Sequence, residues 1–234
     1  MPRPMATLAP VLRGSLQGHS AAAPFAAEVL RVHRRYAGEV VAQNRLCPFL
    51  RDLDTGFGRF CVILDPGEPN VDVAVEAVLS SETLVVHLVY PCIRPSASAF
   101  EKFAARLAQA MKAAYPGPDR PPVMATFHPE LSGDASGPYR LIGMLRRAPD
   151  PFVQFIPEGL HQGGTVFAGV EPVPMDPAER DPALANFERL KGGGVGRIQA
   201  ALADIYEDRA RSYAPFLSQL GLHPAEAAAA AAAR

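Results

Sequence analysis

Apolar residues recur at three- and four-residue steps between residues 24 and 47, a spacing that is typical of a helix with one buried face. Pro24 suits the first turn of such a helix, and Pro48 marks its end, because proline disfavours helical backbone in the residue before it. The pattern therefore predicts a helix from Pro24 to Cys47. Its buried face comprises Phe25, Val29, Leu30, Tyr36, Val40 and Val41.

Two further helices are predicted from the same spacing together with capping residues. Asn70 can cap a second helix, because its side-chain oxygen accepts hydrogen bonds from the free N–H groups of a first turn. Ser98 and Glu101 have the spacing of a capping box at the start of a third helix. The buried stripe of this third helix comprises Phe100, Phe103, Leu107, Met111 and Tyr115.

Short apolar runs rich in β-branched and aromatic residues alternate with these helices and are typical of buried strands. Such runs occupy Gly58–Leu64, Thr83–Tyr90 and Val123–Phe127, and their alternation with helices predicts right-handed crossovers between three parallel strands. Tyr139–Leu145 is interpreted as a fourth strand, and because no helix precedes it, we expect it antiparallel at an edge. Phe152–Ile156 is a candidate for one more strand.

These elements predict one α/β domain with a mixed four- or five-stranded sheet, packed helices and an irregular C-terminal excursion. The closing helix contains Pro215, which we expect to kink it or end it. The predicted organisation is a disordered or flexible arm at 1–23, an α/β core at 24–156, a Gly/Pro-rich excursion at 157–196, a C-terminal helix packed on the core at 197–222 and a tail at 223–234.

Composition and charge exclude several classes of function. The chain has 234 residues, of which 48% are apolar and 20% charged, a makeup typical of a folded globular protein. A formal net charge of −1 disfavours nucleic acid as a partner. No apolar run reaches the roughly 18 residues of a membrane-spanning helix, and three cysteines without paired spacing form no disulfide framework. We therefore expect a soluble cytoplasmic protein with neither a nucleic-acid nor a membrane partner.

Two short segments, LCPF at 46–49 and ATFHPEL at 125–131, together resemble an uncharacterised bacterial family, domain of unknown function family 1415. The resemblance spans residues 26–222. The chain departs from the family's pattern in its longer 157–196 segment and in lacking an asparagine-rich stretch before Tyr139. The resemblance implies a shared fold and two segments of interest, and no particular reaction. Looser matches are TLVV at 83–86, SGPYRLIGMLRR at 136–147 and IYEDR at 205–209.

Cys47 and His128 are the candidate catalytic residues, because a thiol becomes a nucleophile when a base lies within reach. His128 directly follows the third strand, at the edge where parallel sheets gather ligands, and Glu130 can orient its ring or accept a proton. Two features oppose the pairing. Cys47 ends a helix, where the dipole disfavours a thiolate, and a helix that precedes a strand ends at the edge opposite His128. The structural alternatives are a buried cysteine and a histidine that satisfies loop backbone.

Ligand contacts are predicted for four residues. Among them, Arg146 follows the predicted fourth strand and can reach an anionic ligand. The simpler alternative for Arg146 is a solvated charge that keeps an edge strand from pairing with another sheet. KGGGVGR at 191–197 is interpreted as a flexible linker, since it lacks the spacing of a phosphate-binding loop. The four candidates are Asn44, His87, Tyr139 and Arg146.

No metal site is predicted, although four side chains are of types that bind zinc, because no pair of them has the usual ligand spacing. A Cys-Pro dipeptide is also the minimal pattern of a haem thiolate ligand, which keeps a binding function open for Cys47. The four potential ligands are Cys47, His87, Cys92 and His128.

Three functions follow from these patterns. The preferred one is a cytoplasmic small-molecule enzyme with a Cys/His pocket at the strand ends. The alternatives are a non-catalytic haem- or metal-binding protein that uses Cys47 and histidines, and an interaction protein in which both motifs are structural. The sequence indicates no cofactor, reaction type or oligomeric state.

Overall fold

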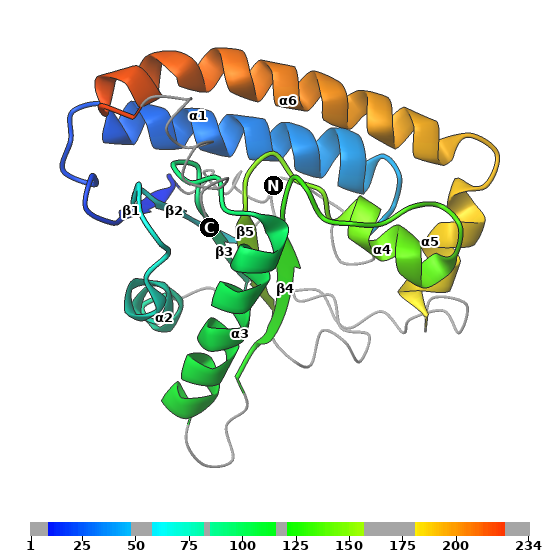
Figure 1. Cartoon of the computed structure of the whole chain (residues 1–234), viewed down its shortest axis with the longest axis horizontal. Coiled ribbons are helices and arrows are strands. Elements are labelled where there is room, and N and C mark those ends of the chain that lie inside the picture. The colour runs from blue at the N-terminus through cyan, green and yellow to red at the C-terminus, as the bar shows by residue number, and fades with distance from the viewer. Residues whose placement is uncertain (1–8, 48–57, 82–84, 116–120, 157–180, 223–234) are drawn as a thin grey trace, which may run out of the picture.

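The computed structural model describes residues 9–47, 58–81, 85–115, 121–156 and 181–222. Within them the chain forms a mixed sheet with helices on both faces (Figure 1), so the predicted α/β class is confirmed. The strands lie in the order β1-β2-β3-β5-β4. They are β1 Val11–Arg13, β2 Arg59–Ile63, β3 Val86–Val89, β4 Val123–Phe127 and β5 Phe152–Ile156.

The helices of the described residues alternate with the strands in the first two thirds of the chain and follow them at the C-terminus. Asn70 caps α2 as predicted, because its side-chain oxygen accepts from the N–H groups of Asp72 at 2.8 Å and Val73 at 3.4 Å. The helices are α1 Ala22–Arg35, the π-helix η1 Tyr36–Ala42, α2 Val71–Leu79, α3 Ala97–Ala114, α4 Pro138–Leu145, α5 Pro182–Leu190 and α6 Gly194–Gln219.

The strand directions confirm the three predicted parallel strands, but an antiparallel strand separates the third of them from the second. β1, β2 and β3 run parallel, and β4 points the same way, because β5 is antiparallel to both β3 and β4. β5 therefore lies inside the sheet, between β3 and β4. This arrangement leaves β4 at one edge of the sheet, next to the segment that carries α4.

Two hydrophobic cores lie on the two faces of the sheet. Phe60 and Val62 pack toward α1, α4 and α6, whereas Cys61 and Ile63 pack toward α2 and α3. These four side chains of β2 are buried, as a strand with helices on both faces requires. The long helix α6 lies along α1 (Figure 1), and an edge-to-face contact between Phe25 and Tyr213 links them, with 5.1 Å between ring centroids.

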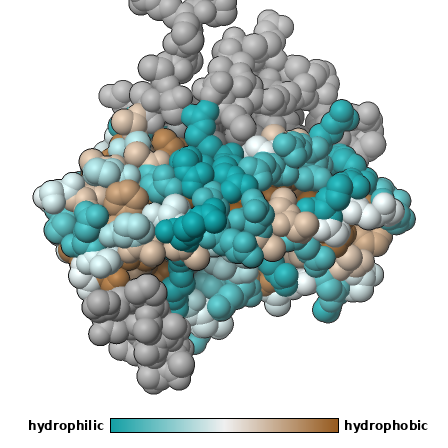
Figure 2. Space-filling view, turned by 90° about the horizontal axis from the view of Figure 1, so that it is seen from above, coloured by the Kyte–Doolittle hydropathy of each residue, from teal (hydrophilic) through white to brown (hydrophobic). Residues whose placement is uncertain are grey.

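The outer surface on the side of α6 is largely hydrophilic (Figure 2). Asp208 of α6 accepts from Arg31 at 2.9 Å and from Arg35 at 2.6 Å, and these bonds lower the pKa of its carboxyl group to about 2. Arg35 also binds Asp204 at 2.6 Å. Ion pairs thus join α1 and α6 along their exposed side. No helix within the described ranges is long and apolar enough to cross a membrane.

The predicted fourth strand, Tyr139–Leu145, is wrong, because these residues form α4. Pro138 occupies the first turn of this helix, where its missing N–H costs no hydrogen bond. Leu141 and Met144 are the buried residues, and their three-residue spacing places both on one helix face. The apolar run was therefore helical in period, and the proline before it was the signal of a helix start.

The predicted capping box at the start of α3 is also wrong. The helix begins two residues earlier than the box requires, and Ser96 is its cap, accepting from the N–H of Ala99 at 3.2 Å. Ser98 lies inside the first turn, and Glu101 lies beyond it. The Glu101 carboxylate is therefore not used to cap the helix.

Four smaller differences concern the two ends of the chain. Val11–Arg13, assigned to the flexible arm, forms β1 and pairs with β2. Residues 182–190, assigned to the irregular excursion, form α5, and 191–197 form the turn to α6 and its first turn instead of a linker. The closing helix is confirmed, but it continues past Pro215 to Gln219. The remainder of the excursion, 157–180, and the tail lie outside the described residues.

Candidate functional site

The backbone before the LCPF segment is unusual in two respects. η1 is a π-helix, a form that is rare and frequently found at functional sites. Arg45 has a φ of 53°, the left-handed region that residues other than glycine seldom adopt. Asn44 donates from its side-chain amide to the carbonyls of Glu39 at 3.2 Å and Val40 at 2.9 Å. These bonds end the helix and give Asn44 a structural role.

Helix α5 holds the same segment from the other side. The amide of Asn186 donates to the carbonyl of Leu46 at 3.1 Å, and Arg189 donates to the carbonyl of Arg45 at 2.6 Å. Two side chains of α5 thereby fix the backbone that leads into Cys47. The excursion thus contributes to the position of the motif.

Cys47 is half-buried and acts electrostatically on the hydroxyl of Tyr36. Burial is the main reason that the pKa of Tyr36 is raised, Cys47 and Tyr206 raise it further, and the guanidinium of Arg146 lowers it. The Tyr36 hydroxyl also donates to the carbonyl of Leu145 at 3.2 Å. Cys47 and Arg146 therefore both act electrostatically on the Tyr36 hydroxyl, which binds the end of α4.

The geometry does not support His128 as the acid/base partner of Cys47. The ring is buried, its Nδ1 accepts from the N–H of Glu130 at 3.1 Å, and its Nε2 donates to the carbonyl of Pro95 at 3.0 Å. Burial lowers the pKa of His128, which favours the neutral ring that this pattern requires. Both nitrogens are used by backbone, so the alternative of a histidine that satisfies loop backbone fits the structure better. Glu130 contributes its N–H to this contact, and its side chain is exposed.

The two motif segments nevertheless approach the same place. The N–H of His128 donates to the carbonyl of Arg146 at 3.2 Å, and Tyr36 of the helix before Cys47 binds the preceding carbonyl of Leu145. The helix before Cys47 was expected to end at the sheet edge opposite His128. Contacts of this helix and of His128 with the end of α4 bring the two segments closer than that expectation. The two contacts are made with consecutive carbonyls, those of Leu145 and Arg146, at the end of α4.

His87, the third predicted ligand contact, is buried in the core. Its Nε2 accepts from the amide of Gln154 at 2.9 Å, and its ring lies 6.0 Å from that of Phe152 and 6.3 Å from that of Phe60, measured between centroids. These contacts join neighbouring strands β3 and β5 on the face covered by α1. They are typical of a core histidine.

A network of charged groups is buried between the sheet and the α1–α6 pair. Asp150 is fully buried and binds Arg209 at 2.7 Å, His33 at 3.1 Å and the hydroxyl of Tyr213 at 3.0 Å. Arg209 belongs to the IYEDR segment and also donates to the carbonyl of Pro91 at 3.2 Å. Because each carboxylate oxygen is engaged by donors from α1 or α6, the network joins both helices to the sheet.

The described residues contain no group of three His, Cys, Asp or Glu side chains placed to hold a metal ion. Cys61 and Cys92 are buried, and burial raises the pKa of their thiols to about 11 and about 12. Neither thiol is therefore ionised near neutral pH. The metal and haem alternatives gain no support from this geometry.

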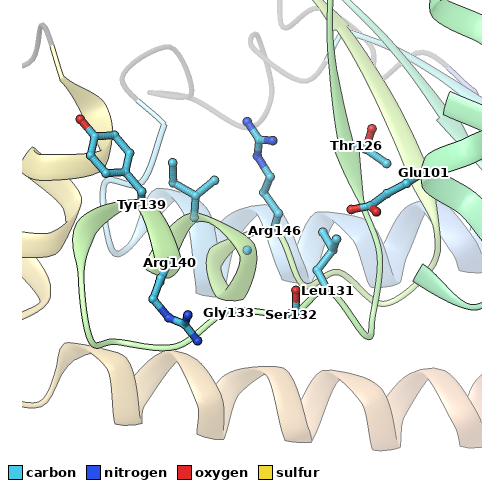
Figure 3. A pocket seen from close by; sticks show the side chains of 10 residues that line it. Glu101, Thr126, Leu131, Ser132, Gly133, Tyr139, Arg140 and Arg146 are labelled. Carbon is cyan, nitrogen blue, oxygen red and sulfur yellow. The ribbon is translucent and has the colours of Figure 1, made fainter. Parts of the chain in front are cut away.

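A cavity of about 470 Å³ lies outside the edge strand β4, between it, the start of α3 and α4 (Figure 3). Its volume is within the range of small-molecule pockets. Figure 3 shows Glu101 and Thr126 on the side of α3 and β4, and Arg146 on the side of α4. The polar and charged residues that line it are Glu101, Thr126, Ser132, Tyr139, Arg140 and Arg146.

Glycines bring the loop after β4 directly onto α4. A Cβ added to Gly143 would overlap the carbonyl oxygen of Ser132, so only glycine permits this approach of two backbones. Arg147 fixes the same loop by donating to the carbonyls of Leu131 at 2.9 Å and Gly133 at 3.3 Å. These contacts fix the loop after β4 against α4, and Ser132 of this loop lines the cavity.

Arg146 is the charge that the cavity presents without a partner. Its guanidinium lies 6.0 Å from the ring centroid of Phe127, and it forms no ion pair with any residue that the structure describes. Surrounding protein lowers its pKa, although the guanidinium stays charged at neutral pH. Tyr139 is 70% exposed and donates to Asp181 at 3.1 Å. The alternative of Arg146 as a charge on an edge strand is wrong, since it follows a helix.

Two of the predicted ligand contacts, Tyr139 and Arg146, thus line the cavity, and Asn44 and His87 do not. Sequence reasoning missed Glu101, Thr126 and Ser132 as cavity residues. The usable signal was the pair of glycines at 133, before the run from Pro138, and at 143, within it, which permit a close approach.

Comparisons with protein-family models, with curated proteins and with solved structures find no match. The resemblance to domain of unknown function family 1415 therefore stays a prediction. The function of the chain must be argued from its own residues.

Proposed function

We propose that the protein binds a small organic anion in the cavity between β4 and α4, with Arg146 as the charged anchor. The observation that carries this proposal is the Arg146 guanidinium, which lines a cavity of about 470 Å³ and forms no ion pair among the described residues. A guanidinium can bind a carboxylate through two parallel hydrogen bonds. Leu131 and Ile142 supply apolar wall for the body of the ligand.

The test is isothermal titration with hexanoate, a carboxylate with a short apolar chain. Arg146→Met removes the charge and keeps an unbranched apolar stem, and we expect it to weaken binding by about tenfold or more. The matched control is Arg106→Met, because Arg106 pairs with Glu68 on the surface, away from the cavity. Equal affinity in the wild type and Arg146→Met would contradict the proposal.

A second candidate function is thiol chemistry at Cys47. It is supported by Tyr36, because Cys47 and Arg146 both influence the pKa of this one hydroxyl. A cation close to a thiol stabilises the thiolate. The guanidinium then takes the activating role that the sequence assigned to His128. Catalysis in this second form would place the reacting thiol next to the anion site.

Alkylation by iodoacetamide near neutral pH tests this candidate. We expect one thiol per folded chain to react, at Cys47, because Cys61 and Cys92 are buried with raised pKa values. The reaction should slow in Arg146→Met and keep its rate in His128→Asn. An unchanged rate in Arg146→Met, or labelling of all three thiols at once, would rule out activation by Arg146.

A further inference from the structure

The cavity that contains Arg146 also presents a negative charge. Glu101 projects from α3 on the other side of the cavity, next to Thr126 (Figure 3). Glu101 and Arg146 do not form an ion pair with each other, and neither has an oppositely charged partner elsewhere in the described residues. Opposite charges that face one cavity without meeting leave room for a ligand between them.

The position of Glu101 follows from where α3 begins. Ser96 caps the helix, so the carboxylate of Glu101 is not needed at the helix N-terminus. Arg140, the other charged residue that lines the cavity, already has an ion-pair partner. Arg140 binds Asp134 through two nitrogens, and this contact lowers the pKa of the Asp134 carboxyl group. One positive and one negative charge are therefore available to a ligand.

We propose that the ligand is a zwitterion of the amino-acid class, with its carboxylate on Arg146 and its ammonium group on Glu101. The proposal rests on the proposed function and deepens it by naming the ligand's second charge. The hydroxyls of Thr126 and Ser132 also line the cavity and can take the remaining N–H and oxygen positions. Leu131 and Ile142 leave an apolar side for the ligand's side chain.

The charge pattern favours this class over two others. A phosphate ester carries close to two negative charges and would be repelled by Glu101, which has no cation to screen it among the described residues. A simple amine meets Glu101 and leaves Arg146 without a partner, so it should bind more weakly than a zwitterion of the same skeleton. A monoanion such as hexanoate meets Arg146 and leaves Glu101 without a partner, so it should bind more weakly than a zwitterion of the same skeleton.

Titration with two matched sets of probes tests the proposal. The first set is norleucine, hexanoate and pentylamine, and the second is phenylalanine, 3-phenylpropanoate and phenethylamine. In each set the members differ in which charged groups they carry. We expect the amino acid to bind about tenfold or more tightly than the acid, and the amine not to bind measurably.

Glu101→Gln is the decisive variant. It should remove the preference for the amino acid over the acid, and it should leave binding of the acid equal or stronger. Glu76→Gln, on the exposed face of α2, is the control and should change neither. Melting curves of each variant check that the fold is kept.

The outcomes separate the two proposals. If the acids bind as tightly as the amino acids, or if Glu101→Gln keeps the preference, the zwitterion is excluded while the anion site stands. If no member of either set binds, both proposals are overturned. Binding of the amines alone would overturn both as well, because it would leave Arg146 without a role.

Discussion

Two arginines of this protein lie over aromatic rings and differ in what surrounds them. Arg209 lies 4.5 Å from the ring centroid of Tyr213 and binds the buried carboxylate of Asp150. Arg146 lies 6.0 Å from the ring centroid of Phe127 and has no carboxylate among the described residues. The first is enclosed by α1 and α6, and the second lines a cavity at the open edge of the sheet.

The difference separates charges that hold the fold from charges that are free to bind a ligand. A buried ion loses its hydration and is tolerated only when partners replace the lost hydrogen bonds, as Asp150 and Arg209 do for one another. His128 belongs to the same kind, since backbone groups occupy both ring nitrogens. Arg146 keeps contact with solvent and therefore does not need an internal partner. Four changes test this contrast.

Loss of the Asp150 carboxylate should have the largest effect. Asp150→Ala leaves Arg209 charged and buried without its partner, and we expect a loss of about 3–5 kcal/mol in the free energy of unfolding. Urea unfolding followed by circular dichroism measures it. Asp204→Ala is the control, because its carboxylate is 68% exposed, and surface pairs contribute about 0–1 kcal/mol. A loss below about 1 kcal/mol for Asp150→Ala would contradict the structural role of the network.

Alanine in place of Gly143 should have the next largest effect. The added Cβ overlaps the carbonyl of Ser132, so the loop after β4 must move, and we expect a loss of about 1–3 kcal/mol in unfolding free energy. Gly196, in α6, has open space around it, and Gly196→Ala should stabilise the protein by about 0.5–1 kcal/mol. Paired urea titrations of the two variants give the comparison. If both gained stability, the close approach of loop and helix would be refuted.

Acidification should weaken the fold through His128. Burial lowers the pKa of this ring in the folded chain, so the unfolded chain binds more protons and stability falls as pH drops below about 6.5, the unfolded value. His128→Asn keeps an acceptor for the N–H of Glu130 and does not titrate. Unfolding free energies at pH 7.5 and pH 5.5 should therefore differ less in the variant than in the wild type. An equal pH dependence in both would remove this role from His128.

Arg146→Met should have the smallest effect on stability. The guanidinium has no internal ion pair among the described residues, so we expect its loss to change the unfolding free energy by less than about 0.5 kcal/mol. The same denaturant titration measures it beside Asp150→Ala. A loss as large as that of Asp150→Ala would show that Arg146 holds the fold, and would remove the distinction between the two arginines.

Most of the fold could be predicted from local patterns. Periodicity and capping chemistry act within a few residues. They predicted the helix of Phe25 and Val29, the capping by Asn70, and the runs that form β2, β3, β4 and β5. α4 was missed because apolar runs of seven residues do not separate strand from helix by period alone. β1 was missed because three residues become a strand only when β2 lies beside them.

The candidate site was less accessible to sequence reasoning. Arg146, placed after a predicted strand, and Tyr139 were predicted as ligand contacts. Both line the cavity, although the strand proved to be a helix, and ligand binding by either stays a prediction. Cys47 and His128 were paired because of their chemistry. The ring of His128 instead bonds to backbone groups of Glu130 and Pro95. No local sequence pattern shows where a side chain finds its hydrogen-bond partner.

The sequence by itself determined most of the helical and extended segments and the faces they bury, α4 and β1 excepted, because these choices depend on spacing and on the first and last turns. Tertiary structure alone decided that β5 enters between β3 and β4, that Asp150 meets Arg209, and that Glu101 and Arg146 face one cavity. Partners far apart in the chain meet only when the sheet order brings them together. Charge on a residue can therefore be read from sequence, whereas its satisfaction or availability is a property of the folded molecule.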